Sequence, residues 1–405
     1  MSMVKKWILI CFGNFLVAAL MGLLLRFQSL SPVTGVNYLF LLHGHSHIAM
    51  LGWVYLALFA LIYHFLIPKN KEIERKFNRL FWVTQLAVVG MMVAFPLQGY
   101  AVFSITFSTL HIFSSYYFAR LVWKYQKIDS LPERYLLKTA LVFMVLSTCG
   151  IWCLGPAVGL MGKTSAFYQI AIQFFLHFQF NGWFIIAVLA LLFHQMQIKV
   201  DNQAFFSFYK WLVAGTLTTF ALPVSWYVSH PILPWINGVG VVIQLVAFVK
   251  LALLLRPKFT EFYAKLKNIE KIVFSFALFS LTLKVLIQLL VIFPELASVS
   301  HQIRNFVIGF IHMIMLGIIS GFLLGFLLNA KVIQRKNRFS EHGIKIFLMG
   351  FVLTEFLLFA QGFNYFLHWS EIPMYHQNLF ISSIWLVIGI IMIIFSNANL
   401  KNNLK

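Results

Sequence analysis

Apolar stretches long enough to cross a lipid bilayer recur along the whole chain and leave little sequence for a soluble domain. A membrane-spanning helix needs about 20 mainly apolar residues, because only a helix satisfies its own backbone in hydrocarbon. With 61% hydrophobic and 10% charged residues, the 405-residue chain differs from ordinary soluble domains. We therefore expect an all-α integral membrane protein, with residues 1–405 forming one polytopic bundle of about twelve helices. The expected spans are 7–27, 43–67, 81–100, 102–122, 136–156, 166–195, 208–228, 232–255, 271–293, 305–328, 344–367 and 378–396.

The positive charges predict the orientation of these spans. Lys and Arg gather in alternate connections, within residues 69–79, 120–138, 199–210, 256–271 and 331–345, whereas the other connections carry few. This positive-inside pattern predicts cytoplasmic termini and a location in the inner, cytoplasmic membrane of a cell. Membrane lipid is the partner expected for the net charge of +20, and nucleic acid is not.

Histidines lie within several spans, mostly toward the predicted outer side. His47, His111, His177 and His312 fall in the second, fourth, sixth and tenth expected spans. An ionisable residue is costly in hydrocarbon, so each is a candidate for a functional site. The alternative for each is a hydrogen bond between helices.

Imidazole is the commonest metal ligand in proteins, and two histidines can hold a b-type haem between helices. His47 and His312 have similar predicted depths, so we expect both to bind haem b. His43 shares the helix face of His47 at a spacing of four residues, whereas His45 points elsewhere.

In its topology the sequence resembles subunit I of the haem-copper oxidase superfamily, and most closely the nitric oxide reductase branch. Residues 47–68 resemble the span that carries the low-spin haem ligand, and residues 177–182 (His-Phe-Gln-Phe-Asn-Gly) resemble a segment that binds the non-haem metal. The resemblance implies haem ligands His47 and His312, and copper or non-haem iron at His177 and His230. It also implies a quinol or cytochrome as electron donor, nitric oxide or oxygen as substrate, and haem propionates near Arg304.

The sequence also departs from this family. His230 stands alone where active members have adjacent histidines, His312 stands alone where they have His-x-His, and Asn181 replaces an acid. We expect either a degenerate binuclear centre or a different one rebuilt with His111 and His43. Residues 43–53, 177–183 and 312–317 also look loosely alike, which hints at internal repetition.

Two charged residues lie near the middle of expected spans, Lys284 in the ninth and Glu355 in the eleventh. A centred charge costs at least roughly 2.5–3.5 kcal/mol, so each should face a partner or a water-filled path. Lys284, Glu355 and Asn181 are therefore candidates for a proton path, and pairing of Lys284 with Glu355 is the structural alternative. A proton-coupled transporter without haem, and a haem- or copper-handling protein without turnover, are the competing functions.

Overall fold

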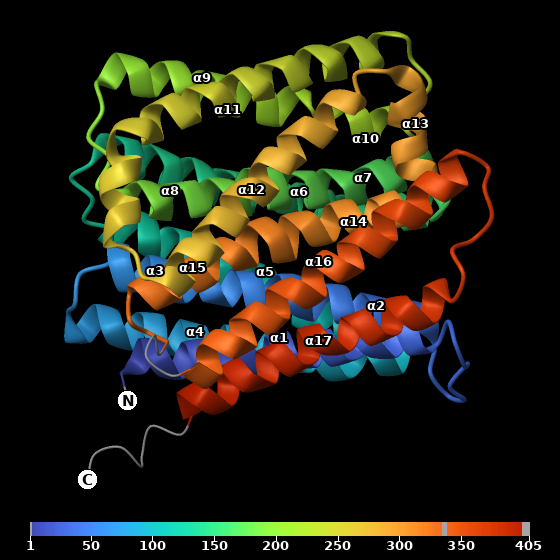
Figure 1. Cartoon of the computed structure of the whole chain (residues 1–405), viewed down its shortest axis with the longest axis horizontal. Helices are drawn as coiled ribbons and strands as arrows, with labels where there is room; N and C mark the ends of the chain where they lie inside the picture. The colour runs from blue at the N-terminus through green and yellow to red at the C-terminus, as the bar shows by residue number, and fades with distance from the viewer. Residues whose placement is uncertain (1, 334–337, 399–405) are drawn as a thin grey trace. The chain divides into compact units, whose positions relative to one another are not determined.

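The computed structural model describes residues 2–333 and 338–398, and every regular element in this part is a helix (Figure 1). Residues 334–337 of the predicted basic connection 331–345, and the predicted cytoplasmic C-terminus, lie outside the described residues. The N-terminal elements are α1 (Met3–Phe27), α2 (Tyr38–His47), η1 (Ile48–Tyr55), α3 (Leu56–Leu66), α4 (Lys71–Gln98) and α5 (Val102–Tyr125). The middle elements are α6 (Leu131–Met161), α7 (Ala166–His177), η2 (Phe178–Phe184), α8 (Ile185–Met196), α9 (Asn202–Thr218), α10 (Ala221–Ser225) and α11 (Ile232–Lys265). The last are α12 (Asn268–Leu290), α13 (Pro294–Gln302), α14 (Arg304–His312), η3 (Met313–Ser320), α15 (Gly321–Asn329), α16 (Arg338–Phe366) and α17 (Tyr375–Ala398).

Within the described residues, ten helical stretches are long and apolar enough to cross a membrane. They are α1, α2–η1–α3, α4, α6, α7–η2–α8, α11, α12, α14–η3–α15, α16 and α17. This confirms the all-α prediction and supports a multi-pass membrane protein. The predicted number of twelve spans is not confirmed.

The expected spans 102–122 and 208–228 account for the difference. The first forms helix α5, whose hydroxyl groups lower its hydropathy and donate back to the helix, as Thr106 does to the carbonyl of Val102 at 2.8 Å. The second is broken, because α9 ends at Thr218 and the short α10 follows. The ring of Pro223 would clash with the carbonyl of Thr219 in a continuous helix, and Pro223 has no N–H to donate.

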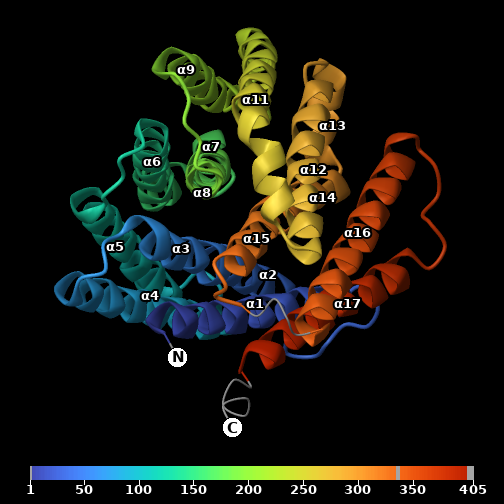
Figure 2. The same ribbon diagram turned by 60° about the vertical axis from the view of Figure 1, so that its left-hand side comes forward.

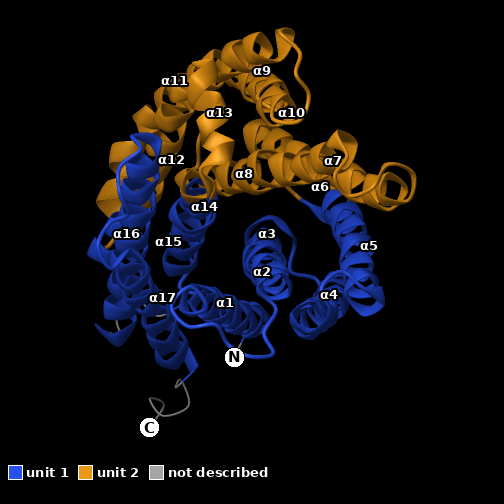
Figure 3. Cartoon of the chain, turned by 90° about the vertical axis from the view of Figure 1, so that its right-hand side faces the viewer, with its two compact units in different colours: residues 1–126, 268–274, 308–405 blue, residues 127–267, 275–307 orange. Residues whose placement is uncertain are grey.

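The chain divides into two compact units (Figure 3). The first contains residues 1–126, 268–274 and 308–405, and the second contains residues 127–267 and 275–307. Within the first unit, α4 packs on α5 and α16 packs on α17; within the second, α6 packs on α7 and α8, and α9 packs on α11 (Figure 2).

The three spans that contain π-helices are the most buried of the ten. The buried shares of their apolar segments are 83%, 78% and 67%, against 56% or less for the other seven. Aromatic rings pack around the first of them, where Trp53 stacks on Phe15 with ring centroids 4.6 Å apart. These three spans are therefore the most enclosed of the ten.

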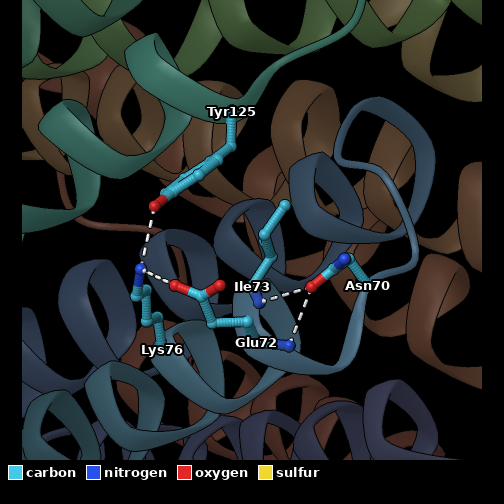
Figure 4. A network of polar contacts seen from close by, with 5 residues as sticks. All are labelled: Asn70, Glu72, Ile73, Lys76 and Tyr125. Carbon is cyan, nitrogen blue, oxygen red and sulfur yellow. Dashed lines mark hydrogen bonds and ion pairs between the residues drawn. The ribbon is translucent and has the colours of Figure 1, made fainter.

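Helix α4 begins with a polar network that ties it to the end of α5 (Figure 4). The Asn70 side chain accepts hydrogen bonds from the backbone N–H groups of Glu72 at 2.8 Å and Ile73 at 3.4 Å. Lys76 pairs with Glu72 at 2.5 Å and donates to the Tyr125 hydroxyl at 2.9 Å. The basic connection before α4 is thus held by helix capping.

Asn70→Ala is expected to lower the free energy of unfolding by about 1 kcal/mol, because two backbone N–H groups lose their acceptor. Denaturant titration in detergent, followed by circular dichroism, measures this change. Asn70→Asp keeps an acceptor oxygen and is expected to retain the wild-type midpoint. Equal losses in both variants would contradict the capping role.

Candidate functional site

Three spans change from α-helix to π-helix directly after a histidine. Helix α2 ends at His47 before η1, α7 ends at His177 before η2, and α14 ends at His312 before η3. A glycine follows five residues after each histidine, at positions 52, 182 and 317. π-Helices make up well under about 1% of residues in proteins and occur mostly at functional sites. The segments whose sequences look alike therefore share one local structure, which supports the internal repetition.

Side-chain hydrogen bonds satisfy part of the π-helical backbone of the first unit. The Asn14 side-chain amide, 3% exposed, donates to the carbonyl of Gly52 at 3.0 Å and to Gln85 at 2.8 Å. The Ser320 hydroxyl in η3 donates to the carbonyl of Met315 at 2.8 Å. The same hydroxyl accepts from the Trp53 indole at 2.8 Å, so η1 and η3 are joined by a buried hydrogen bond.

Asn181 supports the π-helix of the second unit in a different way. Its side-chain nitrogen donates to the carbonyl of His177 at 3.3 Å, whereas its oxygen is buried without a hydrogen-bond partner among the described residues. Asn181 therefore has a structural contact at the turn where the sequence predicted a proton path, and its role in proton transfer stays a prediction.

His47 and His43 lie on one helix face, as predicted from their spacing. The Nδ1 atom of His47 lies 2.8 Å from the carbonyl oxygen of His43. The ring of His47 packs on Phe95 with centroids 4.2 Å apart, and the ring of His43 packs on Tyr100 at 4.7 Å. An N–H donated from Nδ1 to the carbonyl leaves the lone pair on Nε2 of His47, the arrangement typical of metal-binding histidines.

His111 on α5 is the most buried of the candidate histidines, at 4% exposure. Its ring lies edge-on to Tyr55 with centroids 4.7 Å apart, and it is close enough to His47 for an electrostatic interaction. The Nε2 atom of His111 is buried and has no hydrogen-bond partner among the described residues. The first unit therefore places a second available imidazole nitrogen near His47.

His312 lies in a cluster of ionisable side chains from four helices of the first unit. Its Nδ1 atom is 3.6 Å from Oε1 of Glu355, which is 8% exposed and whose carboxylate oxygens lack hydrogen bonds within the described residues. Arg26 interacts electrostatically with both His312 and Glu355, and His45 interacts with both His312 and Arg26. A histidine and an arginine grouped with a buried carboxylate can hold a proton or an acidic ligand group.

The place of His45 in this cluster did not follow from the sequence. Its Nδ1 atom lies 2.8 Å from the carbonyl oxygen of Ala18, and its ring occupies the space that a side chain at Gly22 would need. The two-residue spacing from His47 indicated only that His45 faces another direction. Its contacts with α1 depend on packing between helices.

The candidate histidines of the second unit contact backbone carbonyl and N–H groups, and one of them lies near a buried lysine. The Nε2 atom of His177 lies 2.8 Å from the carbonyl oxygen of Thr216, and Lys284, 2% exposed, is close enough for an electrostatic interaction with it. His230 is exposed, and its Nδ1 accepts from the N–H of Ile232 at the start of α11. Arg304 begins α14. The structure thus brings Lys284 to His177 and Glu355 to His312.

Neither a metal-binding cluster nor a related protein of known function adds to this description of the histidines. Across residues 2–333 and 338–398, no group of three or more His, Cys, Asp or Glu side chains is placed to hold a metal ion. Copper or non-haem iron at His177, His230 and His111 therefore stays a prediction. No protein-family model matches the chain, and no curated protein matches it significantly in sequence.

Proposed function

We propose that this chain is a haem-binding membrane protein similar to subunit I of the haem-copper oxidase superfamily, with a partly degenerate binuclear site and a role in nitric oxide, oxygen or redox chemistry. One observation carries the proposal: the three most buried spans each change to π-helix directly after a histidine. Functional sites often retain such irregular backbone despite its poorer hydrogen-bond geometry. Imidazoles repeated at the same point of three apolar spans favour a bound cofactor over isolated hydrogen bonds.

The donor set of the first unit fits a haem. In the proposal, His47 and His312 would hold the iron. The Nδ1 atom of His47 faces the carbonyl oxygen of His43, which leaves its Nε2 atom for the metal, and the Nδ1 atom of His312 lies 3.6 Å from Glu355. His43 supports His47 through its carbonyl group, and Arg26 is a cation suited to a propionate. A bound haem supplies one-electron chemistry, with a quinol or a cytochrome as the proposed electron donor. Arg304 stays a second candidate for a propionate contact.

The absorption spectrum of the purified protein tests the proposal. A haem held by two histidines would give sharp bands on reduction, and extraction should yield b-type haem in a fixed ratio to protein. Protein purified from cells supplied with iron and a haem precursor, yet without these bands, would contradict the proposal.

Proton-coupled transport without haem is the second candidate function, because two charged groups are buried. Glu355 and Lys284 are 8% and 2% exposed, and buried charges often mark proton or ion routes. The same spectrum distinguishes the two functions. A haem-free protein that moves protons in liposomes, and loses this activity in Glu355→Gln, would favour the transporter.

We also propose that the protein lies in the inner membrane with both termini in the cytoplasm, because every second connection between spans is rich in Lys and Arg. In a variant lacking Cys11, Cys149 and Cys153, a cysteine at Glu74 is expected to react with a membrane-impermeant thiol reagent only in inverted vesicles. A cysteine at Lys163, in the connection between α6 and α7, should react only in intact cells or spheroplasts. The reverse pattern would overturn the orientation.

A further inference from the structure

The second unit contains a cavity of about 220 Å³ that none of the candidate histidines lines. It is bounded by α10, the start of α11, the connection after α12, and α13. Its walls include Leu222, Pro234 and Ile292 together with several polar side chains. The cavity therefore contains none of the proposed haem ligands, and its own lining determines what it can bind.

Two side chains that line this cavity each have a buried polar atom without a hydrogen-bond partner among the described residues. Asn237 is 2% exposed, and its nitrogen donates to the carbonyl of Val291 at 2.9 Å, which identifies the other amide atom as the oxygen. That oxygen is unpartnered, and so is the indole nitrogen of Trp226. Since buried polar groups are nearly always satisfied, the cavity lacks one hydrogen-bond donor and one acceptor.

The remaining polar lining is neutral. The ring of His301 stacks on Trp226 with centroids 4.6 Å apart and planes 20° apart, and its Nε2 lies 3.1 Å from the Tyr227 hydroxyl. Burial lowers the pKa of His301 from its ordinary value, which favours the uncharged imidazole. Within the described residues, no Asp, Glu, Lys or Arg lines the cavity. The lining therefore disfavours a charged ligand.

We propose that this cavity binds the ring of a neutral hydroxyaromatic molecule, a class to which phenols and quinols belong. The ligand hydroxyl donates to Asn237, an oxygen of the ligand accepts from the Trp226 indole, and the ring packs against the apolar wall. A cavity of about 150 Å³ is large enough for benzene, so this volume holds a substituted ring. The proposal is independent of haem binding.

Phenol and its methyl ether, anisole, test the proposal because only phenol has a hydroxyl donor. Their binding to the full-length protein in lipid nanodiscs is measured by equilibrium dialysis, with empty nanodiscs correcting for partition into lipid. Phenol is expected to bind saturably and roughly two- to ten-fold more tightly than anisole, the effect of one hydrogen bond. Trp226→Phe keeps the stacked ring but removes the donor, so phenol affinity should fall by a similar factor. Asn237→Leu should abolish the preference for phenol.

Trp235→Phe is the matched control, because Trp235 is 77% exposed and does not line the cavity. It should leave phenol binding unchanged. Thermal unfolding shows whether each variant is folded, and Trp226→Phe alone decides the result if Asn237→Leu is not. Equal affinity for phenol and anisole, unchanged phenol affinity in Trp226→Phe, or no saturable binding to the wild type would overturn the proposal and leave a water-filled cavity.

Discussion

Replacing His47 with alanine is expected to remove the haem absorption of the purified protein while leaving membrane insertion intact. The substitution deletes the Nε2 atom proposed to bind the iron, and it puts a good helix former at the end of α2. The loss should therefore come from the missing ligand and not from an unfolded span. Reduced-minus-oxidised spectra and the ratio of extracted haem to protein measure it, and size-exclusion chromatography in detergent reports folding.

Further histidine variants make this result specific. His312→Ala should also lose the bands, whereas His376→Ala, at an exposed histidine paired with Glu371 at 3.3 Å, should retain them. His45→Ala and His111→Ala should retain haem if His47 and His312 are the two ligands. Loss of haem in either of those variants would move the second ligand to that residue. A wild-type haem content in His47→Ala would reject the assignment of His47.

Gly150→Ala is expected to destabilise the second unit by about 1–3 kcal/mol or more. A Cβ atom at Gly150 would lie 2.3 Å from the carbonyl oxygen of Ala171, so α6 would have to move away from α7. A backbone atom cannot rotate away as a side chain can. Since α7 carries His177, the same displacement should weaken any ligand that depends on this histidine. Thermal unfolding in detergent measures the stability.

Gly159→Ala is the matched control on the same helix, because nothing lies within 4 Å of the position of its Cβ atom. Alanine favours helix by about 1 kcal/mol over glycine, so this variant should be as stable as the wild type or more stable. Equal destabilisation of the two variants would show that the close approach of α6 and α7 is not the cause.

The sequence predicted the helical class and much of the placement of the spans because these follow from local composition. It was less successful at α5 and α9. The first has the length of a span, but its hydroxyl groups lower its hydropathy, and the second stops before Pro223. Both signals are present in the sequence, but the length of an apolar stretch does not reveal them.

Individual residues of the site show the same division. The shared face of His43 and His47 followed from helix geometry, since a spacing of four residues keeps side chains together along any helix. The partner of Glu355 did not follow, because similar depth suggested Lys284 whereas the structure places His312 3.6 Å from its carboxylate. Depth specifies only the position of a residue along its helix. Contact between two side chains also depends on how each helix is rotated about its own axis.

By itself, the sequence determined the helical class, most of the apolar spans and the alternating basic connections, because each follows from the composition of neighbouring residues. Tertiary structure decided the surroundings of each histidine, including the His45 contact with α1 and the pair formed by His312 and Glu355. It also decided where the α-helices become π-helices. Such a change is stable when neighbouring helices satisfy the displaced backbone groups, as Asn14 does for Gly52, and residues 38 positions apart meet only when the helices pack.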